Sequence, residues 1–197
     1  MTVIGITGPT GAGKTTALHV LQKHGFEVVD CDRLYDSLLE CDEKLRASLR
    51  SAFGDIFLAD GTLDRKGLAQ RVFADQKELN KLNAIVFPVV YAAVEEKIEK
   101  STQKGIAIDA INLVECKLGQ LCDVTVAVTA DPAIRVQRIM ARDGIDRERA
   151  LARVNAQKPD KFYRKNCNFL LENRAGSAAE FERLMEEFMD NILFMEE

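Results

Sequence analysis

The sequence predicts an α/β protein with a mainly parallel β-sheet. Short β-branched runs alternate along the chain with longer helical patterns, which is typical of β–α–β units. The length of 197 residues suits a single core domain with a small insertion and is enough to bury a sizeable core. Hydrophobic residues make up 47% and charged residues 29%, the ordinary composition of a globular protein.

Five short runs, each bounded by polar or turn residues, are predicted strands: residues 3–7, 27–29, 106–109, 124–128 and 169–171. Helical patterns fill the gaps between them, at residues 14–24, 33–39, 43–52, 64–73, 77–100, 132–142, 146–157 and 178–195. Pro88 is expected to kink or break the longest of these helices. The interval from 33 to 104 is much longer than a minimal crossover and therefore predicts an inserted helical subdomain.

Charge and hydropathy exclude several classes of partner. The chain has 27 Lys and Arg against 31 Asp and Glu, a net charge of −4, which disfavours a general electrostatic grip on nucleic acid or an anionic membrane. The apolar run at the start of the sequence is too short and too interrupted by glycine for a signal peptide. No later apolar run approaches the length of a membrane span. We therefore expect a cytoplasmic protein, monomeric, whose partners are small molecules.

The most informative motif is GPTGAGKT at residues 8–15, which matches G-x-x-x-x-G-K-[ST] between the first strand and the first helix. Glycines allow the backbone to wrap a phosphate, and amides at a helix start supply hydrogen-bond donors. Lys14 adds a full charge, and the Thr15 hydroxyl is placed for Mg²⁺. A plain glycine-rich turn would explain Gly13 or Thr15 singly but not the lysine. The predicted ATP-binding residues are Thr10, Gly11, Ala12, Gly13, Lys14 and Thr15.

This loop alone does not distinguish switch GTPases, motor-type ATPases and small-molecule kinases, although the guanine-specific N-K-x-D is absent after the strands. Asp30 and Asp32 follow the second strand, where one carboxylate could orient or deprotonate an attacking hydroxyl. The alternative is that Asp32 caps the next helix and Asp30 is solvated. Asp109 ends the third strand, where an acid can hold Mg²⁺ through water. Its alternative is a simple turn residue.

Arginines cluster after the fourth strand. Asp131 and Pro132 predict a helix start, and Arg135, Arg138 and Arg142 follow on one helical face. An arginine-bearing helical hairpin is what a lid over a triphosphate needs, because guanidinium groups neutralise charge on the transferring phosphoryl. Solvated faces paired with acidic neighbours are the alternative for any single arginine, with Arg138 and Arg142 as the exceptions.

With these residues in order, the chain resembles the dephospho-CoA kinase family over nearly its whole length. The resemblance rests on GITGPTGAGKTT, VVDCDRL near residue 30, LDRKGLAQRVF at 63–73, KLNAIVFPVV, IDAINLVE at 108–115, DVTVAVTADPAIRVQRIMARDG at 123–144, and RVNAQ at 153–157 followed by a late strand and Asn173. It implies a P-loop kinase with a three-layer α/β/α core and a five-stranded parallel sheet. The implied core covers about 1–32 and 105–197, the helical acceptor-binding insertion about 33–104, and the lid about 138–158.

The resemblance also implies residue roles and a reaction, which is transfer of the ATP γ-phosphoryl to the 3′-hydroxyl of dephospho-CoA with Mg²⁺. Asp32 would be the base for the acceptor hydroxyl, and Lys14 would belong to the catalytic set with the lid residues Arg138 and Arg142. Thr15 and Asp109 are the candidate metal residues. The candidate acceptor-binding residues are Asp30, Asp64 and Arg65, with Asp64 equally readable as a helix N-cap.

The sequence departs from the family in three places. The loop reads Gly-Pro-Thr-Gly-Ala-Gly where the family usually has Gly-Gly-Ile-Gly-Ser-Gly, which keeps the required glycines. Phe87 precedes Pro88 at the place where the family usually has a His-Pro pair. Residues 111–113 take the place of a Pro-Leu-Leu stretch of the family, and both changes lie in the presumed acceptor region. Two alternatives therefore stay open: a P-loop kinase for another nucleoside, nucleotide or small metabolite, and a nucleotide-binding homologue without kinase activity.

Overall fold

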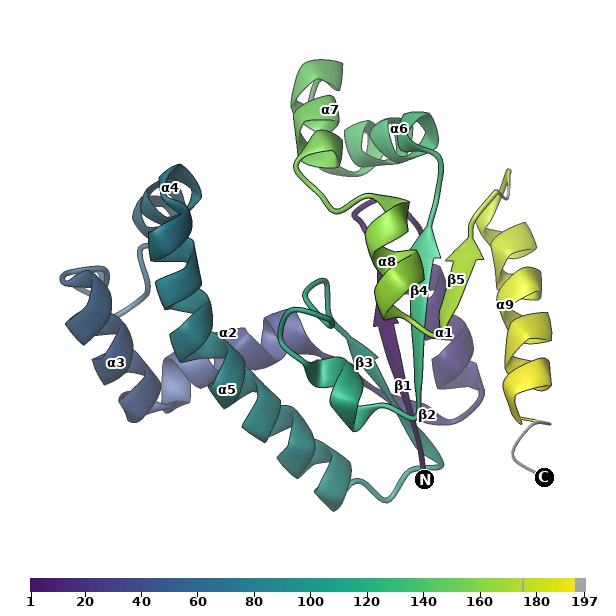
Figure 1. Ribbon diagram of the computed structural model, residues 1–197, viewed down its shortest axis with the longest axis horizontal. Coiled ribbons are helices and arrows are strands. Elements are labelled where there is room, and N and C mark those ends of the chain that lie inside the picture. Colours follow the sequence, from purple (N-terminus) through teal and green to yellow (C-terminus); the bar gives the residue numbers. More distant parts are fainter. Residues whose placement is uncertain (175, 194–197) are drawn as a thin grey trace. The chain divides into compact units, whose positions relative to one another are not determined.

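The computed structural model describes residues 1–174 and 176–193, the last two of these by their backbone only. The chain divides into two compact units, one formed by Met1–Val29 with Ser101–Glu197 and the other by Asp30–Lys100. Figure 1 shows the elements of both units in sequence colours. Within the described residues no helix is both long and apolar enough to span a bilayer.

The sheet of the first unit confirms the predicted five-stranded parallel arrangement. Its strands are β1 (Thr2–Thr7), β2 (Phe26–Asp30), β3 (Gly105–Asp109), β4 (Val124–Thr129) and β5 (Phe169–Glu172). Their order is β2-β3-β1-β4-β5, which places the first strand of the chain at the centre. Thr2 lies opposite Gly105, and Ile4 lies opposite Val124. The turn after β1 therefore lies at the carboxyl edge of the sheet, between the ends of two neighbouring strands.

Helices cover both faces of this sheet (Figure 1). The helices and the 3₁₀ turn of the first unit are α1 (Lys14–Lys23), η1 (Leu118–Leu121), α6 (Pro132–Asp143), α7 (Arg147–Asn155), α8 (Asp160–Asn166) and α9 (Ala178–Leu193). On one face Ile4 and Ile6 are fully buried in a core that includes residues of α1 and α9. On the other face a side chain at Gly5 would lie 2.8 Å from Cys122 Sγ and from Leu113. Residues 194 and 195, the predicted end of the last helix, lie outside the described residues.

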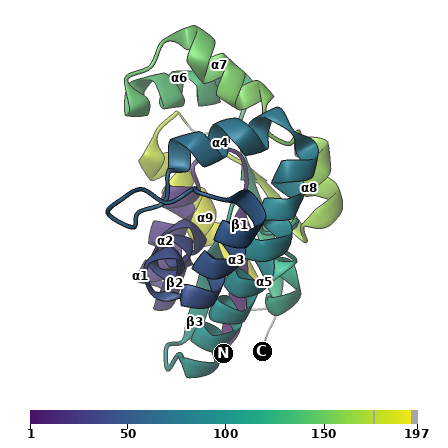
Figure 2. The ribbon, with the colours of Figure 1, turned by 90° about the vertical axis from the view of Figure 1, so that its left-hand side faces the viewer.

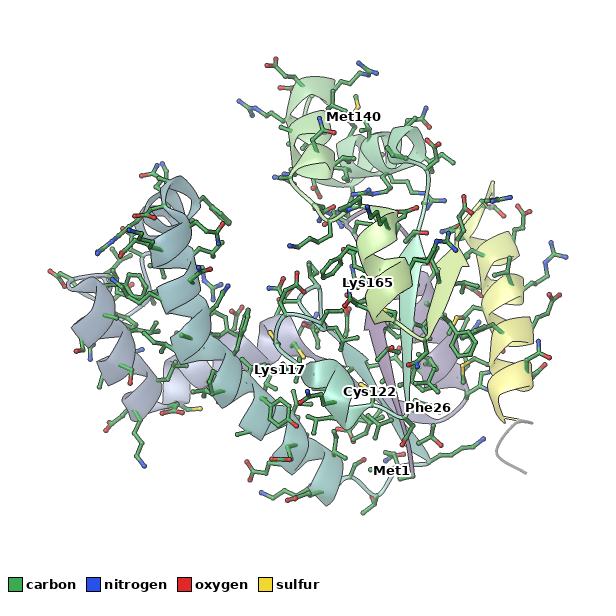
Figure 3. All side chains as sticks on the ribbon, viewed as in Figure 1. Met1, Phe26, Lys117, Cys122, Met140 and Lys165 are labelled. Atoms are coloured by element: carbon green, nitrogen blue, oxygen red, sulfur yellow. The ribbon has the colours of Figure 1, made fainter. Side chains whose placement is uncertain are left out.

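Helices α6 and α7 form a hairpin with defined ends (Figure 2). The Asp131 carboxylate accepts a bond from the Ala133 amide at 2.7 Å, Pro132 occupies the first turn, and Gly144 ends α6 in the left-handed region. The hairpin has its own small core, against which Met140 packs (Figure 3). That core consists of Val136, Ile139, Ala150 and Val154. The hairpin therefore holds together through apolar contacts of its own.

The second unit contains α2 (Cys31–Cys41), α3 (Glu43–Phe53), α4 (Arg65–Ala74) and α5 (Gln76–Lys100). The sequence predicts a kink or a break at Pro88 in the last of these helices, and the break is wrong, because α5 continues through Pro88. Proline costs a helix about 3 kcal/mol. Val90 and Val94 are buried, and Ile85, Val86 and Val89 pack against the apolar core of the unit. Burial on this scale outweighs the local preference of one residue.

Two short elements were not predicted. Helix α8 has the sequence DKFYRKN, whose charged residues give no apolar periodicity. Tyr163 in α8 is buried, so this single apolar anchor holds the helix against the sheet. The other is η1, whose preceding residue Lys117 adopts a left-handed backbone conformation that no glycine or asparagine announces. Elements of one turn offer too few residues for a periodic pattern.

The thiol of Cys116 makes the fold sensitive to alkali. Burial raises the pKa of Cys116 to about 12, with a further contribution from the Glu115 carboxylate. A group whose pKa is raised on folding stabilises the protein below its unfolded pKa, near 9, and loses that contribution as the pH rises toward 12. From pH 9 to 10 we therefore expect Cys116 to contribute a loss of about 1 kcal/mol in the free energy of unfolding.

Urea denaturation under reducing conditions at pH 8, 9 and 10 measures this loss. The Cys116→Ala variant serves as the comparison, because all other titrating groups are shared. We expect the variant to lose less stability than the native chain over the same pH range. Equal slopes for the two proteins would contradict the assignment.

Candidate active site

The predicted phosphate-binding loop connects β1 to α1 at the carboxyl edge of the sheet. Gly8 has φ 131°, and a Cβ there would lie 2.0 Å from the Val128 carbonyl oxygen, so the loop can pass β4 only without a side chain. The Ala12 amide donates to the Pro9 carbonyl at 3.2 Å, which closes the turn. Lys14 Nζ donates to the Gly8 carbonyl at 3.0 Å and thereby lies across the loop. The glycines, the lysine and the helix start thus meet as the motif predicts.

Gly13 provides a test of this loop. It has φ 115°, and a Cβ would lie 2.5 Å from Asn173 Nδ2. We expect Gly13→Ala to lower the free energy of unfolding by about 2 kcal/mol, because left-handed strain and a clash add together. It should also weaken Mg-ATP binding. Chemical denaturation and calorimetry measure the two effects.

Gly144→Ala is the matched control. Gly144 also has a left-handed backbone, with φ 64°, but a Cβ at this position would meet nothing within 4 Å. Its substitution should cost only the strain, about 1 kcal/mol, and leave Mg-ATP binding unchanged. If Gly13→Ala were no more damaging than Gly144→Ala, the close approach of Asn173 would be unimportant.

Two arginines of α6 hold the loop by its carbonyl groups. Arg135 Nε donates to the Thr10 carbonyl at 3.0 Å. Arg138 Nη1 donates to the carbonyls of Gly11 at 3.2 Å and Ala12 at 3.3 Å. The predicted common face of α6 therefore brings both guanidinium groups to the loop backbone. These positive charges lie on the carbonyl side of the loop and add a positive potential close to it.

Asn173, which follows β5, supplies a further contact to the loop. It is buried, and its Nδ2 donates to the Ala12 carbonyl at 2.8 Å. In a trans peptide the C=O of one residue and the N–H of the next point in opposite directions. Donors on the carbonyls of Thr10 and Ala12 therefore turn the amides of Gly11 and Gly13 to the other side of the loop, whereas the Ala12 amide is bonded to the Pro9 carbonyl. Backbone amides turned to one side of a loop can bind an anion.

Arg142, one turn further along α6, has a different environment. Its Nε donates to Asp143 Oδ1 at 2.7 Å, and Arg153 of α7 donates to Asp143 Oδ2 at 2.5 Å. Hydrogen bonding by Arg142, together with both positive charges, holds the pKa of Asp143 below its usual range. Asp143 thus joins the two helices of the hairpin. The structure brings Arg138, but not Arg142, into contact with the loop.

The candidate metal residues lie at the same edge of the sheet. Asp109 ends β3 and lies opposite Ile6, two residues before the loop. Thr15 stands exposed in the first turn of α1. In the described part of the chain no three His, Cys, Asp or Glu side chains gather as a metal cage. A hydroxyl and a carboxylate beside a phosphate loop nevertheless fit Mg²⁺, which prefers oxygen ligands and takes few of them from protein.

Asp30 and Asp32 begin the second unit. Asp30 is the N-cap of α2, and its Oδ1 accepts a bond from the Arg33 amide at 3.0 Å. The alternative in which Asp32 caps this helix is therefore wrong, and the cap adds Cys31 and Asp32 to the predicted helix start. Asp32 lies exposed in the first helical turn, where the helix dipole favours a carboxylate.

The other acceptor candidates lie at the start of α4. Asp64 is the N-cap, as one reading of the sequence suggested, and accepts a bond from the Gly67 amide at 2.9 Å. Arg65 Nη2 donates to Asp36 Oδ1 of α2 at 2.5 Å. This ion pair is largely exposed and contributes little to stability, so Arg65 can exchange its partner for another anion.

Sequence reasoning missed the contacts of Arg135, Gln157 and Asn173 with the loop. Gln157, directly after the α7 cap, bonds to Thr10 from 147 residues away. Arg135 could have been found from its spacing of three residues to Arg138, since both share one helical face. Gln157 and Asn173 carried no local signal, because an isolated amide side chain is ordinary at a helix end or a turn.

The strand, the glycine loop and the helix that follows it define a phosphate-binding α/β protein of the P-loop class. The comparison with known families makes this more specific, because the family model for dephospho-CoA kinase matches residues 2–180. The chain belongs to the dephospho-CoA kinase family.

Individual relatives agree with this assignment. The chain is 35% identical to a dephospho-CoA kinase of Thermus thermophilus, covering 93% of this chain and 88% of the relative. It is 32% identical to one of Carboxydothermus hydrogenoformans, covering 93% and 91%. A crystal structure of a Thermus thermophilus protein superposes with a TM-score of 0.80 at 32% identity, over 98% of this chain and 97% of the other.

Proposed function

We propose that this protein transfers the γ-phosphoryl group of ATP to the 3′-hydroxyl of dephospho-CoA, giving coenzyme A and ADP. The observation that carries the proposal is the P-loop of a dephospho-CoA kinase family member, in which Arg135 and Asn173 hold the carbonyls of Thr10 and Ala12. Phosphoryl transfer requires positioning and charge stabilisation more than covalent chemistry by the protein. A preformed amide cradle supplies both.

Nucleotide binding is assigned to residues 10–15. Lys14 would contact the β- and γ-phosphates together with loop amides such as those of Gly11 and Gly13. Thr15 would hold Mg²⁺ directly, and Asp109 would hold it directly or through water. The ion, when bound, neutralises charge on the phosphate oxygens. The other groups of this proposed phosphate site are side chains and backbone amides of the chain itself.

The acceptor side is assigned to the second unit as an acceptor-binding insertion, which we place at about residues 33–104. Asp32 would orient the 3′-hydroxyl and accept its proton as the hydroxyl oxygen bonds to the γ-phosphorus. The bond from that phosphorus to the β,γ-bridging oxygen breaks, and ADP leaves with the electron pair. Asp30, Asp64 and Arg65 are proposed to contact the acceptor.

The lid is proposed to cover about residues 138–158. The contact of Arg138 with the Gly11 and Ala12 carbonyls supports its role in screening phosphate charge. Arg142 would have to exchange its bond with Asp143 for one with phosphate. We propose that the enzyme acts as a monomer in the cytosol.

A different acceptor is the second candidate, favoured by Phe87 and by residues 111–113, where the chain departs from the usual family sequence. Purified protein with Mg-ATP and dephospho-CoA should form coenzyme A and ADP in equal amounts, measured by chromatography with mass detection. Transfer to another nucleoside, nucleotide or metabolite in a parallel panel, with none to dephospho-CoA, would favour the second candidate. Nucleotide binding without transfer to any acceptor would favour a homologue that lacks kinase activity.

A further inference from the structure

Thr10 is held at three separate polar groups. Its amide donates to Gln157 Oε1 at 3.0 Å, and its hydroxyl accepts from Gln157 Nε2 at 2.9 Å. Its carbonyl accepts from Arg135 Nε at 3.0 Å. The Thr10 amide is therefore hydrogen-bonded within the protein itself, and Thr10 anchors the loop.

The two side chains that hold Thr10 also bind each other. Arg135 Nη2 donates to Gln157 Oε1 at 2.6 Å, which closes a ring of four hydrogen bonds. The Arg135 residue is only 4% exposed, and burial lowers the pKa of its guanidinium. The titratable groups that interact electrostatically with Arg135 are the Asp160 carboxylate and the Tyr163 phenol of α8. A buried cation whose direct partners are neutral oxygens suits a site that will receive a polyanion.

These two residues come from opposite ends of the α6–α7 hairpin. Arg135 lies near the start of α6, and Gln157 lies just after the end of α7. The hairpin has its own core between these ends, and this core holds its two helices together. Both ends therefore converge on Thr10, and a displacement of the hairpin must either move the loop or break this ring.

We propose that Arg135 and Gln157 are positioning residues, here called the Thr10 clamp, that set the P-loop conformation before nucleotide binds and couple the α6–α7 hairpin to it. This inference rests on the proposed function, since the nucleotide is its ligand. The clamp contacts the backbone and the hydroxyl of Thr10. It acts by fixing the Thr10 carbonyl, and hence the direction of the next amide.

The first test needs no nucleotide. Gln157→Leu removes both contacts to Thr10 at similar size, and Gln157→Glu keeps acceptors for the Thr10 amide and for Arg135. Gln137→Leu, on an exposed position of the same helix as Arg135, is the matched control. By amide hydrogen exchange in NMR we expect protection of the Thr10 amide to fall about tenfold in Gln157→Leu, and to persist in Gln157→Glu and Gln137→Leu.

The second test uses nucleotide. Calorimetry should give a Mg-ATP Kd about tenfold weaker for Gln157→Leu, because ordering the loop then opposes binding. The KM for ATP should rise more than kcat falls, whereas general damage to the fold would lower both activity and stability. Thr10→Val removes only the hydroxyl contact and should weaken binding about threefold. Adding it to Gln157→Leu should cost nothing further.

The outcomes separate the clamp from the proposed function. If Gln157→Leu kept both the Thr10 protection and the native Mg-ATP affinity within twofold, the clamp would be refuted while the kinase assignment stood. If the native chain bound no Mg-ATP, the proposed function would fail, and amide exchange would still decide whether the clamp exists. If Gln157→Leu failed to fold, Thr10→Val and Gln157→Glu would be compared singly and combined, because both remove the bond between the Thr10 hydroxyl and Gln157. Fully additive losses in Mg-ATP affinity would refute the clamp.

Discussion

Replacing Lys14 with alanine is expected to lower kcat/KM for ATP by about 10²–10³-fold, the loss found when one preorganised donor to a developing charge is removed. Lys14 Nζ already lies across the loop, bonded to the Gly8 carbonyl at 3.0 Å. Its charge therefore needs little reorganisation to meet a phosphate. Steady-state kinetics with varied Mg-ATP, together with calorimetry, measures the effect on turnover and on affinity.

The matched control is Lys23→Ala, at the other end of α1. Lys23 forms an ion pair with Glu182 of α9 at 3.0 Å, and its removal should alter stability only slightly. Comparable losses in the two variants would mean that α1 had been disturbed as a whole. Near-native kinetics for Lys14→Ala would remove the lysine from the phosphate site.

Asp32→Asn is expected to reduce kcat by about 10²–10⁴-fold, the contribution of a positioned general base, while Mg-ATP still binds. The amide is nearly the same size as the carboxylate but accepts no proton at neutral pH. Asp30, not Asp32, caps α2, so the variant keeps the helix start intact. This separation of roles makes a loss of turnover attributable to chemistry.

Glu40→Gln is the comparison, because Glu40 is an exposed acid near the other end of the same helix. It should keep full turnover. The decisive pair of measurements is kcat with dephospho-CoA and Kd for Mg-ATP in each variant. Near-normal turnover in Asp32→Asn would show that the base assignment is mistaken, and loss of Mg-ATP binding would point to a structural role.

The strands of the sheet could be predicted because each has a short β-branched run between polar residues. The phosphate-binding loop could be predicted because glycines and a lysine at this spacing are typical of phosphate binding. Continuation of α5 through Pro88 could not, since its cause is burial of the helix against distant residues. The role of Gln157 was equally hidden, because only the folded chain brings it to Thr10. Local signals therefore predicted the loop, and tertiary contacts add the residues that hold it.

The central place of β1 has a consequence for synthesis of the chain. The strand is synthesised before its neighbours β3 and β4, which begin at residues 105 and 124. The loop after it waits still longer, for Arg135, Gln157 and finally Asn173. Contacts this distant in sequence form late and slowly. A nascent chain therefore cannot complete the contacts of this loop before Asn173 has been made, and a fragment that stops before Asn173 lacks a donor that holds the loop.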